Sequence, residues 1–540
     1  MINFSRIIFP LFCLSGFSLF FSCTNPDPKP NILVIMTDQQ PVSCVGAYGN
    51  SIIRTPNLDM LADSGHLFEN FYIAAFPCSP SRASLLTGRF LHHHNVFTNN
   101  VKLDPKIPTL GSILSSEGYL TGYFGKAHLG GSMYVGRTGG DGIDYLHEAG
   151  GALDPVGDEI GPYWHYNRVQ SDSGWIPQRA DGGPGEDEAQ LGFEVWQGGW
   201  KNYKNWLLKN GQDSFAYWAG NHDDLQSAPE GTHMYSRLGE EYHMANFFTD
   251  EIEKFIRSNK SGKPWAAVLS YFGPHLPVAP PKPWDTLYAL NEAILPDNFE
   301  DDLSGKPARQ GEISKSYFSS PWTDDQFKDY IRRYWGYCGY IDEQIGRIFD
   351  LLMTTGQWKN TLIIFTSDHG DMLAGHGMIF KLAANGYEEL FNVPAIIKLP
   401  EAAEAGKRHR ALTSSVDLLP TILQTANISI PDSMDGESLL PLIESNSRNW
   451  RNAVFSEVHL PSDEGKTIIC RDHRYKYVYH WHSDDLDELY DLNRDPGELE
   501  NLSYRQEYQS TVDSMQDLIL NWVRHTHHPY AELIAKKATK

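Results

Sequence analysis

The segment Asn31-Ile-Leu-Val-Ile-Met36, followed directly by Thr37-Asp38-Gln39-Gln40, indicates the fold class. A continuous apolar run of this length is typical of a strand that is buried on both faces, as in a parallel sheet. In open α/β sheets, ligands bind beyond the carboxyl ends of the strands. Asp38 and Gln39 therefore lie where oxygen ligands for a cation are useful. The alternative is that Asp38 is an ordinary turn or capping residue.

Three further apolar runs end at residues that are capable of binding or catalysis: Tyr119–Phe124, Lys263–Tyr271 and Trp358–Thr366. The residues that follow them are Lys126 and His128, then His275, then Asp368 and His369. Helical patterns lie between the runs at Thr109–Gly118, Glu241–Ser258 and Tyr330–Leu352. This alternation predicts an α/β fold with a large, mostly parallel sheet flanked by helices. Asp38 and Asp368 are then expected to converge on one cation.

A strand is expected over residues 68–75 and leads into the segment Cys78-Ser-Pro-Ser-Arg82-Ala-Ser-Leu-Leu-Thr-Gly88-Arg89, which places a thiol at the start of a short helix. Pro80 suits the first helical turn, and Ser79 and Ser81 supply capping hydroxyls. The free N–H groups at a helix start attract an anion, and Arg82 adds a planar cation. A nucleophile and an anion site are therefore predicted side by side. The alternative is a loop-to-helix junction with a buried cysteine.

The pattern Cys-x-Pro-x-Arg followed by Thr-Gly-Arg resembles the signature of the type I, formylglycine-dependent sulfatases. Gly125-Lys126-Ala-His128-Leu-Gly130 and Pro274-His275-Leu-Pro277 are similar to two more motifs of that family. The resemblance implies an alkaline phosphatase-like fold, in which a small C-terminal antiparallel sheet with a helix follows the large sheet.

In this family the cysteine is converted after translation to formylglycine, so the resemblance implies that Cys78 is modified by a formylglycine-generating or radical maturation enzyme. A hydroxyl of the hydrated aldehyde, polarised by a metal and by Arg82, is then expected to attack sulfur. Mostly oxygen ligands favour Ca²⁺, with Mg²⁺ as the alternative. Many relatives have Asp at the position of Gln39 and Asn at that of His369. The implied metal ligands are Asp38, Gln39, Asp368, His369 and the modified residue 78.

The resemblance also assigns the sulfate-binding and proton-transfer residues. Lys126 and Lys381 are expected to hold the sulfate oxygens as negative charge spreads over them. His275 is expected to protonate the leaving oxygen, and His128 to remove the proton whose loss expels sulfate. The sequence allows these two histidines to exchange roles.

Composition limits the possible partners. The chain has 540 residues and a formal net charge of −23. A nucleic-acid binder needs a basic face, so this function is excluded. An anionic substrate then requires a local basic pocket.

The first 22 residues resemble a bacterial lipoprotein signal peptide. Arg6 gives a positive start, Ile7–Phe21 is an apolar run, and Cys23 follows in a lipoprotein-type cleavage box. Residues 23–30 are polar and proline-rich, which is typical of a tether. We expect an exported protein with an N-terminal lipid, such as palmitate, on Cys23. The lipid anchors it to a bacterial membrane, at the outer membrane, the periplasmic face or the cell surface. A plain secretory signal is the alternative.

Three regions are predicted after the tether: a catalytic domain over 31–430, substrate-side loops within it over 131–240, and a C-terminal subdomain over 431–540. The loop region is rich in Gly, Asp and aromatic residues and is expected to lie over the edge of the sheet. Its indoles either stack on sugar rings or pack the loops down; they are Trp164, Trp175, Trp196, Trp200, Trp206 and Trp218.

His92, His93 and His94 follow the nucleophile helix and are compatible with a metal-binding tract. Adjacent histidines cannot easily share one ion, so we expect them to be structural and to lie in a loop.

Together, these features predict a sulfatase that acts on a sulfated polysaccharide or oligosaccharide, either algal, such as ulvan or carrageenan, or a glycosaminoglycan. One alternative is a phosphonate or phosphodiester hydrolase of the same superfamily. The other is a catalytically dead, glycan-binding surface lipoprotein.

Overall fold

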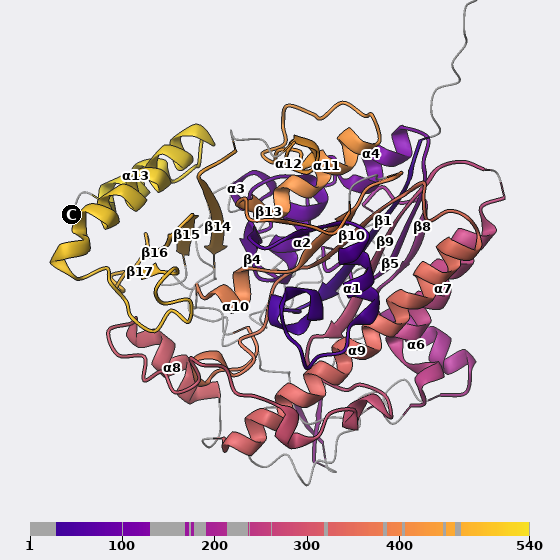
Figure 1. Ribbon diagram of the computed structural model, residues 1–540, viewed down its shortest axis with the longest axis horizontal. Helices are drawn as coiled ribbons and strands as arrows, with labels where there is room; N and C mark the ends of the chain where they lie inside the picture. Colours follow the sequence, from indigo (N-terminus) through magenta and orange to yellow (C-terminus); the bar gives the residue numbers. More distant parts are fainter. Residues whose placement is uncertain are drawn as a thin grey trace, which may run out of the picture.

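The structure is a computed structural model (Figure 1). It describes residues 29–99, 101–129, 168–171, 174–177, 191–212, 236, 238–260, 262–317, 322–381, 386–401, 405–445, 450–459 and 466–538. The predicted signal peptide, Cys23 and nearly all of the tether lie outside these residues, as do Trp164 and Trp218.

An eight-stranded sheet forms the centre of the molecule, in the order β12-β2-β11-β10-β1-β9-β5-β8. The strands in this order are Lys407–His409, His66–Phe68, Ala395–Lys398, Thr361–Ser367, Asn31–Asp38, Trp265–Pro274, Leu120–Gly125 and Val195–Gly198. From β10 to β8 neighbouring strands are parallel, whereas β11 pairs antiparallel with both β10 and β2. The prediction of an α/β fold with a mostly parallel sheet is confirmed.

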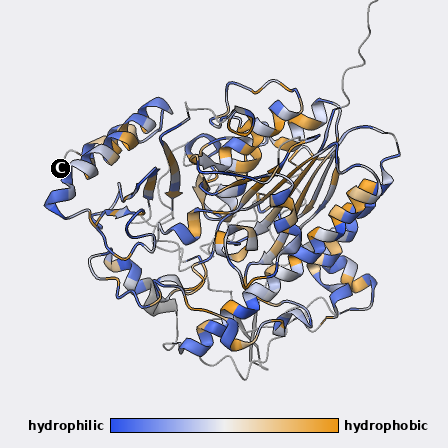
Figure 2. Ribbon diagram, viewed as in Figure 1, coloured by the Kyte–Doolittle hydropathy of each residue, from blue (hydrophilic) through white to orange (hydrophobic). Residues whose placement is uncertain are grey.

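Strand β1 lies between β10 and β9, and its alternating side chains enter two different cores. Leu33 and Ile35 face the core that is closed by α1 (Pro56–Asp63), α7 (Met244–Ser258) and α9 (Asp324–Thr354). Ile32 and Val34 face the opposite core, which is closed by α2 (Cys78–Thr87), α4 (Leu110–Ser116) and α11 (Leu418–Thr425). Figure 2 shows the apolar strands between the two helical layers. Burial on both faces explains why β1 is an uninterrupted apolar run.

A smaller five-stranded sheet has the order β17-β16-β15-β14-β4. Its strands are Glu488–Asp491, Tyr475–Tyr479, Lys466–Asp472, Ala453–His459 and Ala75–Phe76. The first four are antiparallel, as predicted, whereas β4 pairs parallel to β14 with Ala75 opposite Glu457. Side chains of α13 (Gln509–His525) and α14 (Ala531–Ala538) complete the core of this sheet. Helix α14 was not predicted.

Two segments differ from the sequence prediction. Residues 68–75 were expected to form one strand, but β2, β3 (Phe71–Tyr72) and β4 belong to three different sheets, β3 pairing with β13 (Thr413–Ser414). In this segment the chain crosses from the large sheet to the small one, so its residues cannot all pair with the same neighbouring strand. The three histidines after the nucleophile helix form the short helix α3 (Leu91–His94) rather than a loop.

The region 131–240 is not made of loops alone, because β8 and α6 (Gly199–Lys209) belong to the main fold. Trp196 stacks on Tyr123, and Trp200 and Trp206 pack on aromatic side chains of the core at centroid distances of 5.1 and 5.0 Å. For these three indoles the packing alternative is confirmed. Strands β6 (Arg168–Ser171) and β7 (Gly174–Pro177) form a hairpin, but the side chain of Trp175 is outside the described set.

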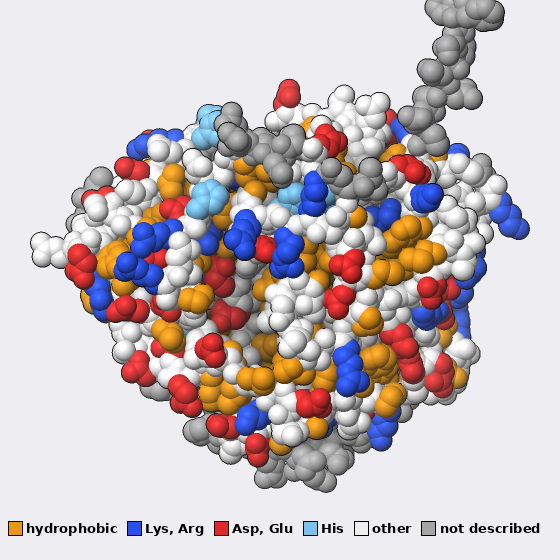
Figure 3. Space-filling view, in the orientation of Figure 1, with side chains coloured by type: hydrophobic (Ala, Val, Ile, Leu, Met, Phe, Trp, Pro, Cys, Tyr) orange, Lys and Arg blue, Asp and Glu red, His pale blue; other side chains and the backbone are white. Residues whose placement is uncertain are grey.

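The remaining helices are α8 (Ala308–Tyr317), α10 (Glu388–Phe391) and α12 (Leu440–Ser445). Among the described helices, none combines the length and the apolar character that a bilayer span requires. Figure 3 shows acidic and basic side chains interspersed over one face of the molecule.

Candidate active site

The predicted site residues meet beyond the carboxyl ends of four neighbouring strands. Asp38 ends β1, Asp368 follows β10, His275 follows β9 and Lys126 follows β5. Cys78 is the first residue of α2 and is fully buried beside them. The sheet topology thus brings together side chains that are far apart in the sequence.

The start of α2 is fixed by serine side chains, although not as predicted. The N-cap residue is Pro77, and no side chain caps the helix. Instead, the Ser81 hydroxyl donates to the carbonyl of Asp368 at 2.5 Å, and the Ser79 hydroxyl donates to the carbonyl of His128 at 2.6 Å. These bonds tie the nucleophile helix to the ends of two strands, so the expectation that the two serines cap the helix was wrong.

Arg82 is buried and is occupied by protein partners. Its guanidinium donates to Asp368 Oδ2 at 2.8 Å and to Asp38 Oδ2 at 3.3 Å. It also donates to the Lys126 carbonyl and to the hydroxyl of Ser270, a β9 residue that was not singled out from the sequence. This arrangement fixes the two carboxylates, because charge-assisted bonds to Arg are strong and directional.

Four predicted ligand residues lie within reach of one ion. One ligand atom each from Asp38, Cys78, Asp368 and His369 lies within 4.8 Å of the others. His369 donates from Nδ1 to the Gly370 carbonyl at 2.8 Å, which leaves the Nε2 lone pair facing Cys78 Sγ at 3.1 Å. Among the described residues, Asp38 Oδ1 has no hydrogen-bond partner although it is buried. A buried, unsatisfied carboxylate oxygen fits a hard cation.

Gln39 is oriented by a residue that was not predicted. Its Nε2 donates to Asp371 Oδ2 at 2.6 Å, and within the described part of the chain its buried Oε1 has no hydrogen-bond partner. Asp371 also accepts hydrogen bonds from Tyr330 and from the backbone of Leu373 and Phe380. The signal was available, since Asp371 follows Asp368 after only two residues. The amide oxygen thus remains free to act as a ligand.

Lys381 joins the nucleophile to one of the predicted catalytic histidines. Its ammonium donates to Cys78 Sγ at 2.7 Å and to His275 Nε2 at 2.8 Å. His275 accepts through Nε2 because its Nδ1 donates to the Leu276 carbonyl at 2.7 Å. Burial and then the charge of Lys381 lower the pKa of His275 to about 3. The second predicted lysine, Lys126, forms an ion pair with Asp38.

The cations hold residue 78 as an anion. Burial raises the pKa of the Cys78 thiol, but Lys126 and Lys381 outweigh this effect and hold it well below its usual range. The Sγ atom stands where a formylglycine would carry its hydroxyl groups. His128, in a left-handed conformation with φ of 57°, hydrogen-bonds the thiol, and burial lowers its pKa to about 4. Lys126 and Lys381 are thus also placed to contact the anionic group of a substrate that residue 78 attacks.

Comparisons with known proteins agree with this geometry. A model of the sulfatase family matches residues 30–178 and 189–428, and a model of the C-terminal region of N-sulphoglucosamine sulphohydrolase matches residues 376–525.

Three curated relatives are similar over nearly their whole length. The chain is 31% identical to an arylsulfatase of Clostridium perfringens, with 93% of this chain and 96% of that protein covered. It is 29% identical to PehA, a multifunctional alkaline phosphatase superfamily protein of Trinickia caryophylli, with 92% and 95% covered. It is 28% identical to the N-acetylglucosamine-6-O-sulfatase of Bacteroides thetaiotaomicron, with 96% and 90% covered.

Among solved structures, the phosphonate monoester hydrolase of Agrobacterium radiobacter has the same fold. It aligns with a TM-score of 0.73 and 24% identity, and the alignment covers 92% of this chain and 96% of the hydrolase. The chain therefore belongs to the sulfatase family of the alkaline phosphatase-like superfamily, and it is a sulfuric ester hydrolase.

Proposed function

We propose that this sulfatase removes sulfate from a sulfated polysaccharide or oligosaccharide, with residue 78 as the nucleophile. The observation that carries the proposal is the contact of Lys381 with both Cys78 and His275. One cation thereby marks where a sulfate oxygen can lie between the nucleophile and a proton donor. The relative that acts on N-acetylglucosamine 6-O-sulfate supports a sugar substrate.

The residues around position 78 have different roles in the reaction. When residue 78 is formylglycine, its hydrated aldehyde supplies the hydroxyl that attacks sulfur. Arg82 holds Asp38 and Asp368 in place, because its hydrogen bonds end on these carboxylates. Lys381 and Lys126 stabilise the charge that spreads over the sulfate oxygens, since both are buried cations beside the nucleophile.

Two histidines are available for proton transfer. His275 contacts Lys381 through Nε2 and is assigned as the acid for the leaving sugar oxygen. A bound sulfate places negative charge beside the imidazolium, which favours the protonated form. His128 hydrogen-bonds position 78 directly and is assigned as the base, because burial keeps it neutral and able to accept a proton.

The ion we propose is Ca²⁺, with Mg²⁺ as the alternative. Asp38, Asp368 and Gln39 offer oxygen atoms, and oxygen donors are the ligands that hard cations prefer. When bound, the ion supplies Lewis-acid polarisation of the nucleophile and of a sulfate oxygen.

The test is desulfation of defined sulfated oligosaccharides, followed by NMR, with the unsulfated sugars as blanks. We expect sulfate release from at least one algal or glycosaminoglycan oligosaccharide, and more slowly from aryl sulfates. Peptide mass spectrometry should find formylglycine at position 78. Turnover by a protein that carries an unmodified cysteine, or by Cys78→Ala, contradicts the mechanism.

A phosphonate or phosphodiester hydrolase activity is the second candidate. It merits a test because the fold is shared with the phosphonate monoester hydrolase of Agrobacterium radiobacter, and because PehA, which is similar over most of this chain, is described as multifunctional. Aryl sulfate, phosphodiester and phosphonate monoester substrates should be assayed side by side on one preparation. A higher kcat/KM on a phosphorus ester would replace the sulfate-ester proposal, whereas binding of sulfated glycans without turnover would support a binding protein.

We also propose that the mature protein is anchored to a bacterial membrane by a lipid on Cys23. The support is the apolar run of residues 7–21 that ends beside this cysteine. Fractionation of producing cells and radiolabelled palmitate provide the test. We expect label and membrane association in the unaltered protein and neither in Cys23→Ala; association without label contradicts the anchor.

A further inference from the structure

A second group of buried metal-ligand side chains lies outside the active site. His92 from α3, Glu457 from β14 and His528, which follows α13, each place one ligand atom within 4.8 Å of the others. His92 Nδ1 lies 2.8 Å from Glu457 Oε2, and His528 Nε2 lies 3.0 Å from Glu457 Oε1. Segments that are more than 350 residues apart in sequence thus meet at one carboxylate.

A fourth side chain, His459, faces the same carboxylate. Its Nε2 lies 3.8 Å from Glu457 Oε1, and its side chain is only 2% exposed. Within the described residues, neither ring nitrogen of His459 has a hydrogen-bond partner, and His92 Nε2 has none either. Leaving a buried imidazole without any partner is costly, so the pair of contacts to Glu457 does not fully account for this site.

The charge states suit a cation. Burial opposes the charge of Glu457, but His92 and His528 outweigh it and hold its pKa well below the usual range. Burial lowers the pKa of His459 to about 4, and among the described residues neither of its ring nitrogens has a hydrogen-bond partner. A carboxylate oxygen and the lone pair of an imidazole nitrogen are both donors that bind a metal ion.

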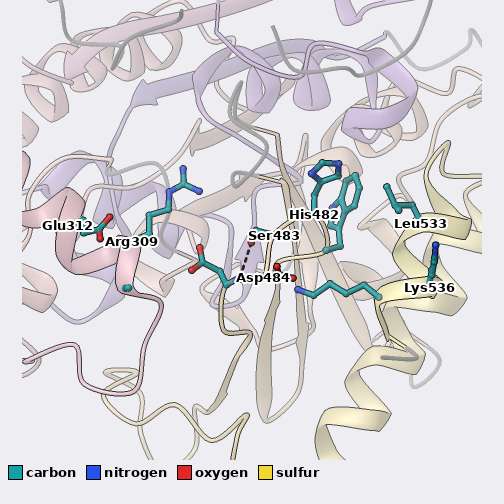
Figure 4. Close-up of a pocket in the computed structure, with 11 residues that line it drawn as sticks. Arg309, Glu312, His482, Ser483, Asp484, Leu533 and Lys536 are labelled. Atoms are coloured by element: carbon teal, nitrogen blue, oxygen red, sulfur yellow. Dashed lines mark hydrogen bonds between the residues drawn. The ribbon is translucent and has the colours of Figure 1, made fainter. Parts of the chain in front are cut away.

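The group is enclosed by the small sheet and by the C-terminal segment. His459 and Glu457 lie two residues apart on β14 and therefore share one face of the strand. Trp481 packs edge-on against His459 at a centroid distance of 5.9 Å and also lines the cleft in Figure 4, which is bounded by Arg309, His482 and Lys536.

We propose that His92, Glu457, His459 and His528 bind a structural Zn²⁺ ion. Three imidazoles and one carboxylate form a donor set that zinc accepts in a four-coordinate site. His92 Nδ1 lies 2.8 Å from Oε2 of Glu457, and the Nε2 atoms of His528 and His459 lie 3.0 and 3.8 Å from its Oε1, so all three imidazoles surround the one carboxylate that would hold the ion. Four protein ligands leave no open position, which is typical of a structural site.

The ion would join three parts of the chain. Helix α3 follows the nucleophile helix, β14 pairs with β4, and His528 belongs to the segment between α13 and α14. The proposal does not depend on the substrate of the active site, and its failure would leave the proposed function untouched.

The decisive experiment counts zinc where the active-site ion has been excluded. The full chain with Cys78→Ala, Asp38→Asn and Asp368→Asn is stripped with chelator, reloaded with Zn²⁺, desalted and measured by metal analysis. We expect one zinc per chain and a higher melting temperature than in the stripped protein. In the same background, His459→Asn and Glu457→Gln should bind zinc at least about tenfold more weakly.

His93 provides a matched control one residue from His92. Its side chain binds Asp435 and the Thr526 carbonyl, and it is one-third exposed. His93→Asn should therefore keep the zinc. X-ray absorption of the loaded background protein should show a nitrogen and oxygen shell with imidazole scattering, which tests the proposal even where a cluster variant fails to fold. Absence of stoichiometric zinc, equal zinc in His459→Asn, or a sulfur shell overturns the proposal.

Discussion

Two buried polar clusters are linked by the segment that runs from Cys78 in α2 to His92 in α3, and they differ in where their charge comes from. Around Cys78, the ammonium groups of Lys126 and Lys381 meet the two carboxylates held by Arg82. Around Glu457, one carboxylate faces imidazole rings, and Ala75 is its partner across the two strands.

This difference in charge suits the cluster around Cys78 to catalysis and the cluster around Glu457 to binding a structural metal ion. A reaction centre needs fixed cations beside the atom whose charge changes, because preorganised charge stabilises the transition state. A closed metal site needs lone pairs and one compensating charge, so neutral imidazoles suffice. The two clusters should therefore respond independently to substitution.

Cys78→Ala should give the largest effect. We expect kcat to fall by at least about 10⁴-fold, because the nucleophile is removed. Zinc binding at the Glu457 cluster should be unchanged. Cys470→Ala, which removes another buried cysteine, is the control and should keep its activity per folded molecule. Loss of zinc from Cys78→Ala would show that the two clusters are coupled.

Lys381→Met should have the next largest effect. We expect kcat/KM to fall by about 10²–10³-fold, because one of the cations that face the sulfate is lost. Lys398→Met is a matched control, since Lys398 is also buried but binds the carbonyls of Trp358 and Thr361 at the start of β10. Equal losses in both variants, measured on folded protein, would assign Lys381 a structural role only.

Asp371→Asn should weaken calcium binding rather than abolish turnover. The substitution disturbs the acceptor that orients Gln39, and loss of such a supporting residue costs about 10–100-fold in metal affinity. The calcium dependence of the rate measures it, with the exposed Asp513→Asn as control. An unchanged calcium requirement would remove Gln39 from the ligand set.

His243 is a buried histidine outside both clusters, and it makes the stability of the folded protein depend on pH. Burial lowers the pKa of His243 to about 3, while its Nδ1 accepts from the backbone of Ala245 at the start of α7. Below pH 6.5 the unfolded chain takes up a proton that the folded protein excludes, so stability is lost as the pH falls from 6.5 towards 3.

His243→Asn keeps an N-cap acceptor but does not titrate. Between about pH 7.5 and 6, the free energy of unfolding should decline by about 1 kcal/mol less in this variant than in the unaltered protein. Urea unfolding at both pH values gives the comparison. Parallel declines would mean that other groups dominate acid unfolding.

Much of the fold follows from local sequence, because a strand that is buried on both faces must be apolar throughout. This explains why β1, β5, β9 and β10 are predicted near their observed positions. The segment 68–75 was predicted wrongly because its three short strands are set by partners in distant parts of the chain. No local pattern distinguishes one long strand from three short ones.

The site was predicted at the level of residue types but not of contacts. Strand-end positions and motif spacing identified Asp38, Cys78 and Asp368, which the structure brings together. Asp371 and Ser270 were missed, because their importance depends on what they orient rather than on a motif. For the same reason, three consecutive histidines gave no indication that only His92 would meet Glu457.

The pairing of β4 with β14 has a consequence for biosynthesis. The strand that leads into Cys78 is made early, but its partner leaves the ribosome only when most of the chain has been synthesised. A contact between such distant segments forms late in folding. Cys78 is fully buried in the finished protein, so the maturation enzyme that the family resemblance implies would have to reach it before the C-terminal sheet closes. The order of synthesis thus provides an interval in which the cysteine is accessible, and a C-terminal truncation should prolong it.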